Sequence, residues 1–98
     1  MRLTYHPEAE LELIEAARFY EKRVATLGAE FLDLVDESVR QIQGSPQGFR
    51  VVEGDVRLFI MKRFPFSIYF RIMLAEIRIL AFKHHSRQPD YWRLRLSE

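Results

Sequence analysis

The stretch from Val56 to Lys83 constrains the fold most, because apolar side chains recur at every second position in three successive runs. Successive side chains of a β-strand point to opposite faces of a sheet, so this alternation predicts half-buried strands. The strands are expected at 56–61, 66–73 and 77–82, with short connections between them. We therefore predict an antiparallel meander sheet.

The two faces of this predicted sheet differ in polarity. The even-numbered residues from Phe66 to Ile72 form a continuous apolar row on one face, which other elements have to cover. On the other face, polar or amphipathic side chains interrupt the apolar pattern at Arg57, Tyr69, Arg71 and Arg78. We expect this second face to stay open to a partner.

The residues before the sheet predict a short strand at 1–6 and then a helix. Pro7 suits the first helical turn, where a missing N–H costs nothing. Apolar residues then recur at three- and four-residue steps, which predicts one buried stripe. The stripe comprises Leu13, Ala16, Ala17, Tyr20, Val24 and Leu27, widened by Leu11, Ile14 and Phe19. The acids of this helix are interpreted as a solvated face: Glu8, Glu10, Glu12 and Glu15.

Gly28 interrupts that stripe, and a second helical stripe follows until Gly44 and Pro46 end it. The second stripe comprises Phe31, Leu32, Val35, Val39 and Ile42. The short break predicts an αα-hairpin whose joint apolar face covers the sheet.

Two further segments complete the predicted fold. Val51 and Val52 are candidates for an early start of the strand at Val56. Pro89 and Asp90 are expected to open a short C-terminal helix, anchored by Tyr91, Trp92 and Leu96. The prediction is a single α+β domain over residues 1–98, in the order β-α-α-β-β-β with a short last helix.

Composition narrows the function classes. The chain has no cysteine, which excludes disulfides and thiolate metal sites. It has no apolar run of membrane-spanning length and no apolar core of a secretory signal at its start, so we expect a cytoplasmic location and no membrane partner. Residues 1–48 hold five Lys/Arg and nine Asp/Glu, whereas residues 49–98 hold ten and five. A basic half of this kind attracts anionic partners unless its charges are merely solvated.

The candidate site residues lie in this basic half. Arg57, Arg63, Arg71 and Lys83 are expected to gather on one side of the sheet, where arginine and lysine bind phosphates. Candidate target- or nucleic-acid-binding residues are Arg57, Lys62, Arg63, Arg71, Lys83, His84, Arg87 and Trp92. Trp92 and Tyr69 have an alternative interpretation as core residues, and His84 and His85 as one packed and one solvated histidine. No metal ligand spacing is present, so no metal or cofactor is expected.

Ordered segments along nearly the whole chain resemble the RelE/ParE superfamily of bacterial type II toxins, especially its ParE-like, plasmid-stabilisation branch. They are His6 to Glu10, Ala16 to Glu21, Gly28 to Val35, Ser45-Pro46, Arg63 to Arg71 and His84 to Trp92. The resemblance implies the fold predicted above. It also implies a labile antitoxin that neutralises the toxin and alone brings it to operator DNA.

The resemblance further implies one of two activities. Members similar to RelE cleave messenger RNA on the ribosome without metal, and members similar to ParE poison DNA gyrase and are not nucleases. If the chain is a metal-independent endoribonuclease, His85, Tyr91 and Arg87 partly match the catalytic positions after the last strand. A third alternative is an inactive binding module that acts only with the antitoxin as a co-repressor.

The sequence departs from the nuclease pattern at two places. Nuclease members carry basic residues along the second strand and an arginine early in the third. Here Leu58 and Ile60 occupy the second strand, and the third opens with Ser67. This departure favours a growth inhibitor that acts on gyrase, through a basic sheet face and the C-terminal segment, over a ribonuclease.

Overall fold

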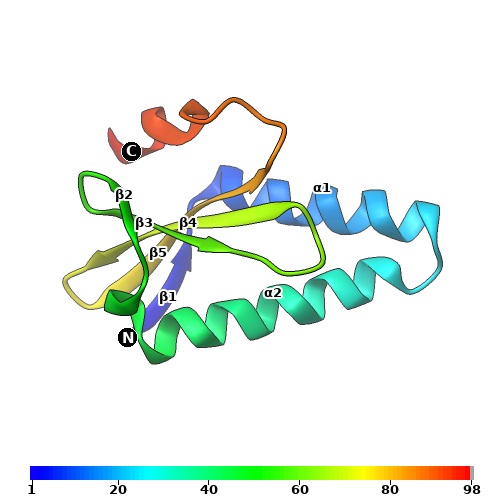
Figure 1. The fold of residues 1–98 in the computed structure, drawn as a ribbon, viewed down its shortest axis with the longest axis horizontal. Helices are drawn as coiled ribbons and strands as arrows, with labels where there is room; N and C mark the ends of the chain where they lie inside the picture. Colours follow the sequence, from blue (N-terminus) through cyan, green and yellow to red (C-terminus); the bar gives the residue numbers. More distant parts are fainter. Residues whose placement is uncertain (98) are drawn as a thin grey trace.

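The computed structural model describes residues 1–97 and has a helical layer, a sheet and a C-terminal 3-10 segment (Figure 1). The elements in chain order are β1 (Arg2–Tyr5), α1 (Pro7–Arg23), α2 (Leu27–Gly44), η1 (Pro46–Gly48), β2 (Val51–Glu53), β3 (Val56–Ile60), β4 (Phe66–Met73), β5 (Glu76–His84) and η2 (Tyr91–Ser97). This order confirms the predicted α+β fold, with one strand more than expected.

The sheet has the strand order β1-β5-β4-β3-β2. Strands β2 to β5 form the predicted antiparallel meander, and β1 joins its edge parallel to β5. The extra strand is β2, because Gly54, at a φ of +55°, turns the chain between Val52 and Val56. Val51 and Val52 therefore belong to a separate edge strand and do not extend β3.

The helical hairpin covers the apolar face of the sheet, as predicted. Phe31, Val35 and Ile42 of α2 pack in one core cluster with Ile68 and Phe70 of β4. Burial of large apolar side chains of this kind contributes about 1.5–3 kcal/mol each. The ring of Phe31 lies 5.3 Å from that of Phe66, so aromatic contacts join the two layers.

The connection between the helices differs from the prediction. The turn lies at residues 24–26, and Gly28 sits inside the first turn of α2. A Cβ at Gly28 would lie 2.5 Å from the carbonyl oxygen of Ala17, so glycine allows α1 and α2 to approach closely. The carboxylate of Glu21 accepts hydrogen bonds from the backbone N–H groups of Thr26 and Gly28, which otherwise lack helical partners.

The buried stripe of α1 is narrower than the sequence indicates. Ala9 and Ala16 are buried, and Leu13, Ala17 and Tyr20 pack against the core. By contrast, Leu11, Ile14, Phe19 and Val24 are exposed, so their assignment to the buried stripe is wrong. Val24 lies beyond the helix end, and Phe19 lies at the edge of the sheet, where it lines an open cavity with Phe66 and Phe82.

The second face of the sheet is not open where η2 lies on it (Figure 1). Trp92 packs there in a second core cluster with Val56, Leu80 and Ala81. The expectation of an uncovered second face is therefore wrong for this part of the sheet. No helix within residues 1–97 is long and apolar enough to span a membrane.

Candidate functional site

The carboxylate of Glu12 on α1 binds three side chains of the C-terminal region. Its Oε2 accepts hydrogen bonds from Arg87 Nη1 at 3.0 Å, Tyr91 Oη at 2.6 Å and Arg95 Nη2 at 2.9 Å. Its Oε1 accepts from Arg95 Nη1 at 2.9 Å. We call Glu12, Arg87, Tyr91 and Arg95 the Glu12 cluster.

The Glu12 cluster also satisfies the backbone of β5 beyond the end of β1. Glu12 Oε1 accepts the Phe82 N–H at 3.1 Å, and Arg95 Nη1 donates to the Leu80 carbonyl at 2.8 Å. A register shift leaves Leu80 without a partner in β4, which makes its carbonyl available. The exposed fractions of the Glu12 and Arg95 side chains are 12% and 9%, so this ion pair lies largely out of water.

Tyr91 lies between two guanidinium groups. The Arg87 group is 3.7 Å and the Arg95 group 4.9 Å from the centre of its ring, which are cation–π distances. Burial and the hydrogen bond to Glu12 raise the pKa of the Tyr91 hydroxyl well above its ordinary value of 10.0. This hydroxyl is therefore held protonated, as a donor to Glu12, at neutral pH.

The candidate catalytic residues bind different partners. Arg87 and Tyr91 meet at Glu12, whereas His85 Nε2 lies 3.1 Å from Ser67 Oγ of β4. His84 packs its ring on Phe66 with the ring centres 5.2 Å apart, and its Nδ1 accepts the Ser86 N–H. The arrangement is that of one packed and one exposed histidine, the structural alternative from the sequence.

The expectation that the cations gather on one side of the sheet is wrong. In the β3–β4 ladder, Arg57 lies opposite Phe70 and Val56 lies opposite Arg71. Opposite residues of antiparallel strands point to the same face of the sheet. Arg57 and Arg71 therefore point to opposite faces. Arg57 Nη1 donates to the Phe49 carbonyl at 2.7 Å, and Arg71 forms two hydrogen bonds with Asp55.

The other two cations of that group are also engaged. Arg63 reaches Glu30 of α2 at 2.7 Å, on the helical side of the molecule. Lys83 is buried, and its Nζ donates to the His84 carbonyl at 3.2 Å. The predicted binding roles of these residues stay predictions. The four cations do not form a shared basic concavity that would support these roles.

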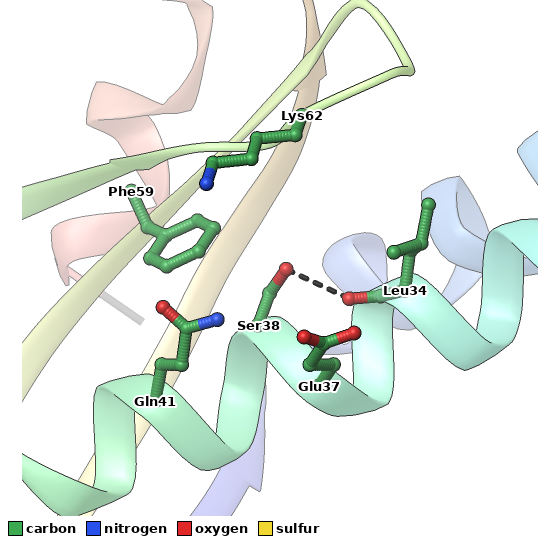
Figure 2. A pocket seen from close by; sticks show the side chains of 6 residues that line it. All are labelled: Leu34, Glu37, Ser38, Gln41, Phe59 and Lys62. Carbon is green, nitrogen blue, oxygen red and sulfur yellow. Dashed lines mark hydrogen bonds between the residues drawn. The ribbon is translucent and has the colours of Figure 1, made fainter.

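Lys62 lies over a shallow cavity of about 90 Å³ between α2 and β3 (Figure 2). Ser38 lies in the floor of this cavity and donates to the Leu34 carbonyl at 2.7 Å, so its hydroxyl is satisfied. Lys62 itself is exposed and forms no ion pair within the described chain. It is placed on the helical side, away from η2.

Trp92 is a packing residue in this structure. Its exposed fraction is 3%, its ring lies 5.2 Å from that of Tyr69, and its Nε1 donates to the Pro89 carbonyl at 2.9 Å. A ring in this position has no free face for a base, so the core interpretation fits the structure better than the binding one.

Sequence reasoning missed Glu12, because the acids of α1 were interpreted as one solvated face. Glu12 follows the buried Ala9 by three residues and precedes the buried Ala16 by four. It therefore lies on the buried side of α1, between two small residues that leave space for its partners. That spacing was the available signal. Across residues 1–97, no three His, Asp or Glu side chains are grouped as metal ligands.

An αα-hairpin on a β-meander with a parallel first strand, and a C-terminal segment on the other face, defines a toxin of the RelE/ParE superfamily. A family model described as the ParE toxin of the type II toxin–antitoxin system parDE matches residues 3–89. The chain belongs to this ParE toxin family.

A solved structure agrees with this assignment. A chain of the chromosomal ParDE TA system from P. aeruginosa is 26% identical, with a TM-score of 0.66. The similarity covers 86% of this chain and 95% of that chain. Among curated proteins, no sequence matches significantly.

Proposed function

We propose that this ParE-family toxin arrests growth by inhibiting DNA gyrase and that a cognate antitoxin neutralises it. The observation that carries the choice of gyrase over the ribosome is the engagement of Tyr91 and Arg87 by Glu12. These two residues are the side chains that a ribonuclease of this fold would need free.

Metal-free RNA cleavage requires a base for the 2′-hydroxyl, an acid for the leaving oxygen and cations for the phosphorane charge. The Tyr91 hydroxyl is directed at a carboxylate, and its raised pKa keeps it protonated, so the tyrosinate needed as a general base is scarce at neutral pH. Arg87 is paired with the same carboxylate, and β3 carries Leu58 and Ile60 where nuclease members carry cations. These features favour the non-nuclease activity.

The C-terminal segment is the surface that we assign to the target. The cations of the sheet are dispersed, so a basic sheet face no longer supports target binding. On η2, the exposed fraction of Leu94 is 80%, although Trp92 and Arg95 on either side of it are buried. An exposed leucine on an anchored segment suits contact with a protein, since such side chains supply apolar area at interfaces.

The antitoxin is proposed from the P. aeruginosa ParDE TA system, whose chain this protein resembles. Exposed apolar residues on the outer side of α1 and on the edge strand β2 are candidate contacts: Leu11, Ile14, Val51 and Val52. In this scheme the toxin reaches operator DNA only through the antitoxin.

Two assays separate the candidate functions. Purified toxin is expected to reduce supercoiling by gyrase, and antitoxin added in equal amount is expected to restore it. Unaffected supercoiling at saturating toxin would exclude gyrase as the target.

Toeprinting on translating ribosomes tests the alternative. New cleavage ends that disappear in His85→Ala would establish the ribonuclease instead. If induction of the isolated gene does not slow growth, the protein is an inactive binding module.

A further inference from the structure

The C-terminal region reaches the sheet through a segment without regular structure. Residues 85–90 separate β5 from η2, and η2 has seven residues in 3-10 conformation. A 3-10 segment of this length is not stable alone, because its hydrogen bonds are poor and few. Its position therefore depends on tertiary contacts.

Those contacts are of two kinds. Trp92 and Leu96 pack on the apolar patch of Val56 and Leu80, which holds η2 without fixing its orientation sharply. The directional contacts are of two sorts: Arg93 pairs with Glu53 of β2 on the exposed surface, where ion pairs contribute little. Arg87, Tyr91 and Arg95 all bind the one carboxylate of Glu12, which lies largely out of water.

A single acceptor group thus fixes both ends of the segment. Arg87 lies before η2, Tyr91 at its first residue and Arg95 near its end. Of the three, Tyr91 has no other hydrogen-bond partner in the described chain, and Arg87 has no other ion pair there. Without the carboxylate, only the Leu80 carbonyl would still receive a hydrogen bond from the side chains of this group.

We propose that Glu12 is the positioning residue of this toxin: its carboxylate orders residues 87–95 and thereby presents Leu94 to the target. The inference rests on the proposed function for its target, but the ordering itself does not. The exposed fraction of the Glu12 side chain is 12%, so we expect it to act on the target through the segment and not by direct contact.

The chain carries its own reporter for this ordering, because Trp92 is its only tryptophan and lies within the segment. Glu12→Gln keeps the size of the side chain but replaces one carboxylate oxygen with an NH2 group that accepts no hydrogen bond. Because Oε2 accepts three hydrogen bonds and Oε1 two, either orientation of the amide removes the acceptor of at least two donors. Glu15→Gln is the matched control, since Glu15 lies on the same helix, is exposed, and makes no ion pair in the described chain.

We expect Glu12→Gln to shift Trp92 emission to the red and to increase its quenching by acrylamide, with the far-UV circular dichroism of helices and sheet retained. Gyrase inhibition and growth arrest are expected to be lost in Glu12→Gln and kept in Glu15→Gln. Tyr91→Phe removes one hydrogen-bond donor and keeps the ring. It is expected to show a smaller red shift of Trp92 emission and a partial loss of gyrase inhibition and growth arrest. It replaces Glu12→Gln in the comparison if that variant does not fold.

The outcomes separate the two proposals. Unchanged Trp92 emission in Glu12→Gln would overturn the positioning role. Red-shifted Trp92 emission in a variant that still arrests growth fully would overturn it too. Lost growth arrest with an unshifted Trp92 would overturn it as well, because Glu12 would then act on the target directly. If wild-type toxin leaves gyrase unaffected, the proposed target fails, while Trp92 emission and growth arrest still decide the role of Glu12.

Discussion

Glu12 and Arg95, 83 positions apart in the sequence, form two hydrogen bonds of 2.9 Å that join the start of α1 to the end of η2. Arg95 lies beyond the last residue that the family model matches, residue 89. The pair therefore connects the shared part of the fold to a C-terminal segment whose sequence that match does not cover. Both side chains are mostly buried, so the connection is only weakly screened by solvent.

Replacing Arg95 with methionine is expected to destabilise the protein by about 3 kcal/mol, because removing one member of a buried ion pair leaves the other uncompensated. Arg87 and Tyr91 still donate to Glu12, which places the loss at the low end of the range for buried pairs. Urea denaturation followed by circular dichroism measures the free energy of unfolding.

Arg93→Met is the control for that substitution. Arg93 is exposed and pairs with Glu53 and Asp90 on the surface, where ion pairs contribute little. Equal decreases in the free energy of unfolding for Arg93→Met and Arg95→Met would show that the Glu12 cluster stabilises the protein no more than an exposed ion pair does.

Gly28→Ala is expected to destabilise the protein by about 1–3 kcal/mol, because the new Cβ would meet the Ala17 carbonyl oxygen at 2.5 Å and separate the helices. Gly44→Ala supplies the comparison, since a Cβ at that position has no neighbour within 4 Å. Thermal unfolding of the two variants measures the difference. A Gly28→Ala protein as stable as Gly44→Ala would contradict the close helix contact.

The alkaline limit of stability is set in part by the tyrosines. Burial raises the pKa of Tyr5, Tyr20, Tyr69 and Tyr91 above the ordinary value of 10.0. Above pH 10, the unfolded chain has lost these protons and the folded chain retains them, so the free energy of unfolding falls as the pH rises. This contribution is fully present below pH 10 and is lost as the pH rises through the folded pKa values.

Absorbance at the tyrosinate band during an alkaline titration tests this expectation. The folded protein should ionise its tyrosines at higher pH than the urea-unfolded chain, and Tyr91→Phe should remove the latest part of the transition. Coincident titration curves for the folded and unfolded chains would refute the burial argument.

Leu94→Asp is expected to leave the fold intact and to weaken gyrase inhibition, because it places a charge on the surface assigned to the target. The exposed fraction of Leu94 is 80%, so the substitution costs little stability. Leu74→Asp is the comparison, as Leu74 is fully exposed at the turn between β4 and β5. Equal inhibition by the two variants, measured at matched concentrations, would remove Leu94 from the target surface.

The fold was predictable because strand alternation and helical periodicity act over many residues and agree with each other. Which face of β3 points to the helices was not predictable from the sequence. Val56, Leu58 and Ile60 alternate with Phe59 and Met61, and both rows are apolar. Only pairing with β4 decides that Phe59 joins the helical core and Val56 the other face. Glu12 was missed for a similar reason, because its partners come from the other end of the chain.

The topoisomer distribution of a reporter plasmid tests the central claim most directly, in cells where the toxin is induced without antitoxin. The account predicts that, as wild-type toxin stops growth, inhibited gyrase leaves the plasmid relaxed or cleaved, and that Glu12→Gln has neither effect. A normally supercoiled plasmid in fully arrested cells would contradict it.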